Sequence, residues 1–463
     1  MKKIITFILG LQAIIAVSQH VEISGTAIGH PDELVRLICY KDQFSRLDNT
    51  LAITRTDVWG NFTLDVSVEK TNYAFLALGL KKGDFYLEPG NKYQFQILDD
   101  TIKGSIYDQM PLQFNLYATN SILNSRIGQF NYEYNVFLYE NQRQIIRAKD
   151  KSIVNNFIEE MKRKYAVNEV PSEIYLTDYV IYTLASLEWI SKSKPDSAIL
   201  MEFFVNQEIL YNNIAYSDFF RDFFKEYFNT QKFYIYDELI TAIRSQQMAK
   251  IDSLLVRDDL LATDDQVRQL VLINLLARNF HNQDVAKEDI LHILSQLQVS
   301  AKSLENRRVA KNYIEKLTYL QYGSKAPQFE LMNHNGQMVK LEDLKGQFIL
   351  LNFISSTCKP CLFDFQKLSE IQQSLGSKLK IVTIVSDGNQ DAVTAYKTEN
   401  DFNWLVLNLN ENIVLLESYQ VKTFPAYILL NPDASIAMAP APPPNENLEL
   451  FIKGFMSRYQ NNK

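Results

Sequence analysis

The sequence predicts three folded parts in series: an N-terminal antiparallel β-sandwich, an all-α middle domain and a C-terminal α/β domain. Alternating apolar and polar residues indicate strands in the first hundred or so residues. No glycine occurs between Gly128 and Gly323, which is typical of a long helical region. Strands and helices then alternate to the end of the chain, which indicates a mixed sheet. We place the three domains at residues 19–104, 105–322 and 323–463.

The composition is that of a globular protein with a large core. Of the 463 residues, 46% are hydrophobic and 22% are charged. The formal net charge is −7, and no basic patch is visible in the sequence. We therefore expect no nucleic acid among the partners of this protein.

Residues 1–18 have the pattern of a secretory signal peptide. Lys2 and Lys3 precede an apolar run from Ile4 to Val17, and Ala16–Ser18 supply small residues that suit cleavage before Gln19. An uncleaved membrane anchor is the alternative, although the run is short for a spanning helix. We expect a periplasmic protein, in an oxidising compartment where paired thiols form disulfides.

Turn signals divide the first domain, and nothing in it predicts catalysis. They lie at Gly29–Pro31, Trp59–Asn61, Lys82–Asp84 and Pro89–Asn91. Cys39 falls on a predicted strand, where we expect a buried, unreactive thiol.

The middle domain is predicted to hold roughly eight to ten helices, with many aromatic residues. Two interpretations of these aromatics remain open: a helix–helix core, or an apolar groove for a partner or an unfolded substrate. No clustered histidines, acids or cysteines predict a metal site here. The aromatics include Phe203, Phe204, Phe219, Phe220, Phe223 and Phe224.

The last domain begins after a linker at Gly323–Pro327. A hairpin around His334–Gly336 is followed by a buried strand at Phe348–Ile354 and a helix at Leu362–Leu375. Further elements are predicted at Lys380–Val385, Asp391–Asn400, Leu405–Leu407, Ile413–Tyr419, Tyr427–Leu430 and Leu448–Arg458.

Two cysteines with C-x-x-C spacing lie where the strand at Phe348–Ile354 gives way to a helix. The helix N-terminus carries partial positive charge and unpaired N–H groups, which favour a thiolate. Cys358 sits at that terminus and is the expected nucleophile. Cys361, one turn later, lies within reach to resolve a mixed disulfide.

Three other interpretations of this pair compete with a redox role. A zinc site needs two more ligands, but Cys39 is distant in the chain and His334 is the only nearby histidine. A c-type haem site needs histidine at position 362, which is leucine. A purely structural disulfide stays open, although so tight a loop restrains the unfolded chain little.

Residues 323–463 resemble the TlpA-like branch of the thioredoxin superfamily, which are exported thiol–disulfide oxidoreductases. The matching segments are Gly323–Leu331, Leu344–Phe353, Ser356–Cys361 and Val421–Leu429. The resemblance implies a thioredoxin-like fold, a redox-active Cys358–Cys361 disulfide and a cis peptide bond before Pro425. It also implies that the backbone of Phe424 faces an extended substrate strand.

Further positions follow from the same resemblance. Asp364 stands where the family often has an acid, and it would move a proton or tune a thiol pKa; the alternative is a solvated helix residue. Asn352 replaces the buried acid of thioredoxin itself, as is common in TlpA-like proteins. Thr357 and Gln366 depart from a frequent Trp and Pro, which bears on substrate preference. Tyr86–Gly90 resembles the end of a β domain that often precedes thioredoxin-like domains in exported bacterial proteins.

The sequence thus predicts a periplasmic thiol–disulfide oxidoreductase acting on protein thiols and disulfides, with no cofactor and no metal. Lys359 adds positive charge near Cys358, and Pro360 shapes the first helical turn. A reductase would need a membrane electron donor; direction, substrate and oligomeric state stay open. The alternative is an exported binding protein, in which the first two domains recognise a partner and the last domain is accessory.

Overall fold

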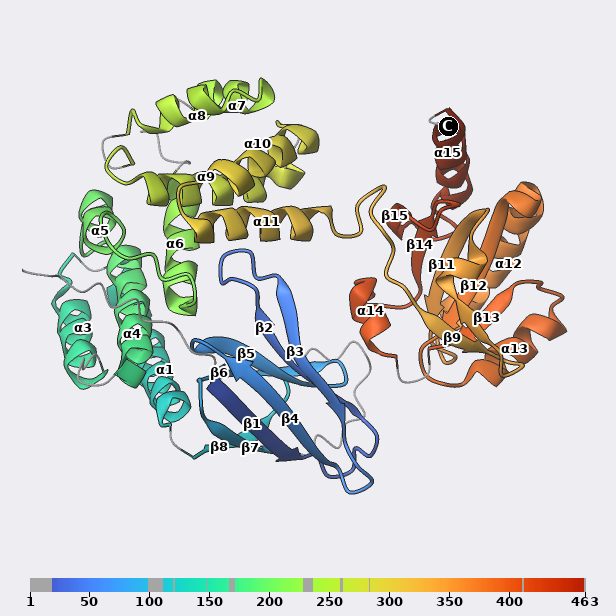
Figure 1. Ribbon diagram of the computed structural model, residues 1–463, viewed down its shortest axis with the longest axis horizontal. Coiled ribbons are helices and arrows are strands. Elements are labelled where there is room, and N and C mark those ends of the chain that lie inside the picture. Colours follow the sequence, from blue (N-terminus) through green and yellow to red (C-terminus); the bar gives the residue numbers. More distant parts are fainter. Residues whose placement is uncertain are drawn as a thin grey trace, which may run out of the picture.

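The computed structural model describes residues 19–98, 111–119, 121–147, 149–165, 171–227, 236–258, 261–282, 284–409 and 412–461. The signal peptide expected at residues 1–18 lies outside these residues. Figure 1 shows a β domain, a helical domain and a C-terminal domain that follow one another along the chain. Among the described residues, no helix combines the length and the apolar character that crossing a bilayer requires.

The β domain consists of two four-stranded sheets, ordered β4-β1-β7-β8 and β3-β2-β5-β6. Inward-facing residues of both sheets form one core. The strands are β1 (Gln19–Thr26), β2 (Leu34–Tyr40), β3 (Asp48–Arg55), β4 (Asn61–Val68), β5 (Asn72–Leu78), β6 (Lys81–Leu87), β7 (Lys92–Ile97) and β8 (Phe114–Ala118).

Two features of the β domain differ from the expectation. Strands β1 and β7 pair in parallel, so the prediction of a wholly antiparallel domain is wrong at this pair. A long connection separates the two strands, and only hairpin-linked strands must be antiparallel. Strand β8 pairs with β7, so the β domain extends to Ala118, past the boundary expected at residue 104.

The turn predicted at Lys82–Asp84 lies inside strand β6 instead. A Cβ atom on Gly83 would lie 2.4 Å from the carbonyl oxygen of Leu112, so glycine serves close backbone approach there. The chain turns earlier, at Gly79, which has a φ of 60°.

The described part of the helical domain contains eleven α-helices, more than expected. They are α1 (Leu123–Glu140), α2 (Gln142–Arg147), α3 (Ser152–Tyr165), α4 (Pro171–Ile190), α5 (Asp196–Phe203), α6 (Ile214–Tyr227), α7 (Tyr236–Arg244), α8 (Met248–Leu255), α9 (Asp265–Arg278), α10 (Lys287–Ser300) and α11 (Leu304–Thr318). The six phenylalanines named above are all buried, with exposed fractions of 5% or less. They form the core, and the groove interpretation of these residues is wrong.

The β domain and the helical domain interlock through the turn between β2 and β3. Phe44 in this turn is buried in the helical core, 5.3 Å from Phe220 between ring centroids. The hydroxyl of Tyr313 donates to the carbonyl of Phe44 at 2.8 Å, and Asn312 donates to Asp42, also at 2.8 Å. In Figure 1 the β2–β3 hairpin rises toward α11 accordingly.

The C-terminal domain is built on a seven-stranded mixed sheet, ordered β10-β9-β13-β12-β11-β14-β15. Its strands are β9 (Glu330–Asn333), β10 (Met338–Lys340), β11 (Phe348–Ile354), β12 (Leu379–Val385), β13 (Leu405–Asn408), β14 (Ala426–Leu430) and β15 (Ile436–Ala441). Its α-helices are α12 (Lys359–Leu375), α13 (Gln390–Glu399), α14 (Val414–Ser418) and α15 (Leu448–Asn461). Strand β15 was not predicted, because its alanines and Pro440 are poor strand signals.

Central strand β11 is buried on both faces, as its uninterrupted apolar run predicts. Leu350 and Ile354 enter a core shared with α12 and α15. Leu351 and Phe353 point the other way, into a core shared with α14. The C-terminal end of β11 is therefore held firmly where the two cysteines follow.

Candidate active site

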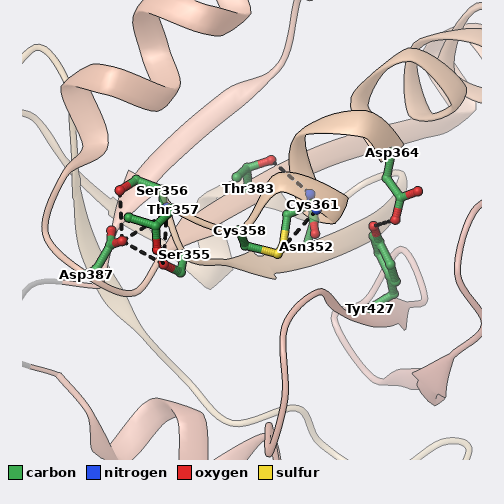
Figure 2. The surroundings of a disulfide bond; sticks show 10 residues. All are labelled: Asn352, Ser355, Ser356, Thr357, Cys358, Cys361, Asp364, Thr383, Asp387 and Tyr427. Atoms are coloured by element: carbon green, nitrogen blue, oxygen red, sulfur yellow. Dashed lines mark hydrogen bonds between the residues drawn. A yellow bond between two sulfur atoms is a disulfide. The ribbon is translucent and has the colours of Figure 1, made fainter. Parts of the chain in front are cut away.

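Cys358 and Cys361 form a disulfide at the start of α12, with their Cα atoms 5.3 Å apart (Figure 2). Cys358 is the N-cap residue of α12, and Pro360 lies in the first turn, where a missing N–H costs nothing. The sequence prediction of a cysteine pair at a strand-to-helix junction is confirmed in its geometry.

The two cysteines differ in exposure. Cys361 is completely buried, whereas Cys358 is partly exposed. The backbone N–H of Cys361 donates to Sγ of Cys358 at 3.3 Å. A negative charge on Cys358 would therefore be stabilised by this N–H and by the helix dipole.

Asp364 is buried, with 9% of its surface exposed. The hydroxyl of Tyr427 donates to Oδ2 of Asp364 at 2.7 Å (Figure 2). The amide of Asn445 donates to Oδ1 of Asp364 at 3.4 Å. Burial and the nearby carboxylate raise the pKa of Tyr427 above its usual range, so the tyrosine remains a donor at neutral pH. The alternative interpretation of Asp364, a solvated helix residue, is wrong.

Asn352 lies in the middle of β11 and is completely buried. Its amide donates to Oγ1 of Thr383 at 3.4 Å, and the indole of Trp404 donates to the same oxygen at 3.0 Å. Oδ1 of Asn352 has no hydrogen-bond partner among the described residues. A neutral side chain at this position avoids the larger cost of a buried charge.

The peptide bond between Phe424 and Pro425 is cis. It directly precedes β14, which pairs with β11 so that Ala426 lies opposite Phe353. This register places Pro425 beside Ile354, the last residue of β11. Ile354 lies four residues before Cys358 in the sequence. Phe424 and Cys358 pack against the same core. The cis-proline loop and the redox turn therefore lie at the same end of the central strands β11 and β14.

A carboxylate that the sequence analysis missed lies beside the redox turn. Asp387 follows β12 and accepts hydrogen bonds from Ser355 and Ser356 (Figure 2). The signal for it was the polar Ser386–Gly388 segment directly after a buried parallel strand, an edge where sites gather in α/β sheets. Tyr427 carried no comparable signal, because it alternates with apolar residues of an ordinary buried strand.

Cys39, the third cysteine, is unpaired and 5% exposed, within the core of the β domain. Burial raises the pKa of its thiol, although a hydrogen bond from Asn49 opposes the rise. The expectation of a buried thiol is confirmed.

A buried strand that leads to a C-x-x-C disulfide at a helix N-cap, next to a cis-proline before an antiparallel strand, defines a thioredoxin-like domain. Residues 322–439 match the AhpC/TSA family. The C-terminal region is thus a thioredoxin-like domain, and the relatives described next are thiol–disulfide oxidoreductases and thioredoxin-like proteins.

Thiol-disulfide oxidoreductase ResA of Bacillus subtilis is 30% identical over 115 residues, which cover 25% of this chain and 64% of ResA. The match therefore spans just under two thirds of that relative. Thioredoxin-like protein YneN of the same organism is 27% identical over 124 residues, 26% of this chain and 72% of YneN. The solved thioredoxin domain of a thiol-disulfide oxidoreductase from Bacteroides vulgatus is 25% identical, covering 29% of this chain and 96% of that domain, with a TM-score of 0.27.

Proposed function

We propose that this protein is a periplasmic thiol–disulfide oxidoreductase that exchanges disulfides with protein substrates. The observation that supports it best is the asymmetry of the C-x-x-C pair, with a partly exposed Cys358 at the helix N-cap and a buried Cys361 behind it. An exposed sulfur can meet a protein substrate, whereas a buried one reacts only within the molecule.

In the reducing direction the exchange has two steps. The Cys358 thiolate attacks one sulfur of a substrate disulfide; a Cys358–substrate bond forms, and the other substrate sulfur leaves as a thiolate. Cys361 then loses its proton and attacks Cys358, which restores the internal disulfide and releases the second substrate thiolate. The substrate gains two electrons and, from solvent, two protons. The reverse sequence oxidises a substrate dithiol.

Asp364 is proposed to take the proton of Cys361 during resolution, directly or through one water molecule. It lies one helical turn after Cys361, and a buried carboxylate is suited to proton transfer. Phe424 and Pro425 are proposed to receive an extended substrate segment through the Phe424 backbone. Export rests on the pattern of residues 1–18, and a reductase would take its electrons from a membrane donor.

The decisive experiment is turnover by the Cys358→Ser variant, compared with the wild-type protein in a disulfide-reduction assay. We expect activity to be abolished, because serine cannot form the mixed disulfide. Full activity in this variant would exclude the proposed role. The reduction potential of the pair, measured together with thiol trapping from cells, separates the directions: a low potential and reduced thiols indicate a reductase.

A binding protein is the second candidate, and one observation favours it. Residues of the β domain and the helical domain together line a cavity of about 1040 Å³. Lys41, Asp178 and Glu208 are among the charged residues of its wall. If the segment 323–463 alone matches the full chain on a natural partner, this cavity is not needed for recognition.

A further inference from the structure

The turn that delivers Cys358 is tied to a neighbouring strand end. Strands β11 and β12 are parallel, and Ile354 pairs with Val385 at their last residues. The N–H of Ser386 donates to the carbonyl of Ile354 at 2.9 Å and extends the ladder by one bond. The segments Ser355–Thr357 and Ser386–Gly388 therefore lie side by side at the C-terminal ends of these two strands.

One oxygen of Asp387 accepts three hydrogen bonds from the neighbouring segment Ser355–Thr357. Oδ2 accepts from Oγ of Ser355 at 2.7 Å, from the N–H of Ser356 at 2.8 Å and from Oγ of Ser356 at 2.8 Å. Hydrogen bonds to an ionised carboxylate are roughly twice as strong as neutral ones. Figure 2 shows this cluster on the side of the disulfide opposite Asp364 and Tyr427.

The contacts continue from this cluster to the cysteine. The N–H of Cys358 donates to the carbonyl of Ser355 at 3.1 Å, and the N–H of Thr357 donates to Oγ of Ser355 at 3.3 Å. Ser355 thus links the carboxylate of Asp387 to the backbone of the nucleophile.

A simpler role for Asp387 is to shape its own loop. Its other oxygen, Oδ1, accepts from the N–H of Asn389, but at 3.4 Å. This local bond is longer than each of the three bonds to the redox turn. The geometry therefore indicates that the Asp387 side chain mainly binds the turn before Cys358.

We propose that Asp387 is a positioning residue of the redox site, whose carboxylate holds the Ser355–Ser356 turn so that Cys358 stays at the N-cap of α12. The inference rests on the proposed function. This contact matters most in the dithiol state, because the disulfide no longer tethers Cys358. The turn and the hydrogen bond from the N–H of Leu362 to the carbonyl of Cys358 then hold the sulfur near the N–H of Cys361. Held there, the thiolate is stabilised by the N–H and the helix dipole.

Charge and positioning predict opposite effects on Cys358, which makes the proposal testable. Removing a nearby negative charge by itself lowers a thiol pKa. Releasing the sulfur from the helix N-terminus raises it. We therefore measure the rate of Cys358 alkylation against pH in the reduced protein, for wild type, Asp387→Ala and Asp387→Asn.

We expect the alkylation profile of Asp387→Ala to move to higher pH, with a rate at neutral pH reduced about tenfold. Asp387→Asn keeps an acceptor oxygen and should retain part of the wild-type behaviour; it also serves if the alanine variant does not fold. An unchanged profile, or a shift to lower pH, in the folded variants would overturn the proposal.

Asp433 offers a matched control in the same domain. It accepts from the N–H and Oγ of Ser435, at 3.0 and 2.7 Å, in the turn between β14 and β15. This turn lies at the far end of β14 from Pro425, so Asp433→Asn should leave the profile unchanged. The alkylation assay needs no substrate, so it tests the positioning role of Asp387 alone. The proposed oxidoreductase function is tested separately, by turnover.

Discussion

The guanidinium of Arg36 and the carboxylate of Glu417 form two hydrogen bonds between the β domain and the thioredoxin-like domain. Nη1 lies 2.5 Å from Oε2, and Nη2 lies 3.0 Å from Oε1. Arg36 is 3% exposed, and its Nη2 also donates to the carbonyl of Gly79. Glu417 lies on α14, which precedes the cis-proline loop and faces the β domain in Figure 1.

Replacing Arg36 should therefore weaken the attachment of the β domain to the thioredoxin-like domain. We expect Arg36→Ala to lower the free energy of unfolding by about 2 kcal/mol, because the partly buried Glu417 loses two charge-assisted hydrogen bonds and keeps Lys82, at 3.7 Å. Urea unfolding measures this loss. The exposed Lys367–Glu370 pair is the control, and Glu370→Gln should cost less than about 0.5 kcal/mol. Equal losses in the two variants would contradict the assignment.

The Cys361→Ser variant should accumulate mixed disulfides. Cys358 can still attack a substrate, but no second thiol resolves the intermediate. Non-reducing electrophoresis and mass spectrometry detect the adduct. The double variant Cys358→Ser/Cys361→Ser is the control, and adducts of equal abundance in it would mean that the attacking thiol is not Cys358.

Tyr427→Phe should slow resolution and destabilise the domain. It leaves a buried Asp364 oxygen without its best donor, at a cost of about 1–3 kcal/mol. Tyr419→Phe is the matched control for this variant, because Tyr419 is also buried and its hydroxyl donates to the carbonyl of Pro327 at 2.8 Å. Both variants should lose stability, but only Tyr427→Phe should prolong the mixed disulfide in single-turnover measurements. Equal lifetimes would assign Tyr427 to stability alone.

Cys39 should resist modification in the folded protein. Its thiol is buried, and burial raises its pKa, so little thiolate exists at pH 8. Alkylation of the reduced, folded protein followed by mass spectrometry should label Cys358 and spare Cys39, while urea exposes both. Rapid labelling of Cys39 without denaturant would show that the β domain opens readily.

Asp387 should make stability depend on pH in acid. Partial burial opposes its charge, but hydrogen bonds from Ser355 and Ser356 outweigh this and lower its pKa below 3.8. A depressed pKa contributes stability above the unfolded value and loses it as pH falls through the folded value. The stability difference between wild type and Asp387→Asn should be constant near neutral pH and shrink below about pH 4. A difference that stays unchanged at pH 3 would contradict this.

Local patterns in the sequence were sufficient to predict the strand β11 and the cysteine pair that follows it. The apolar run Phe348–Ile354 predicted β11 with its observed bounds, and the C-x-x-C spacing predicted the cysteine pair at the start of α12. Such features depend on residues a few positions apart, whose periodicity and capping act within one element.

Only the tertiary structure decided how distant segments meet. Tyr427 reaches Asp364 across 63 residues, and Asp387 reaches Ser356 across 31. The parallel pairing of β1 with β7 and the insertion of Phe44 among the helices likewise join segments that no local pattern relates. The partners of a buried polar group are set by packing, because burial penalises every unpaired donor and acceptor wherever its partner lies in the chain. For this reason the cysteines could be identified from the sequence, and Asp364 from the family resemblance, whereas Asp387 and the hydroxyl of Tyr427 could not.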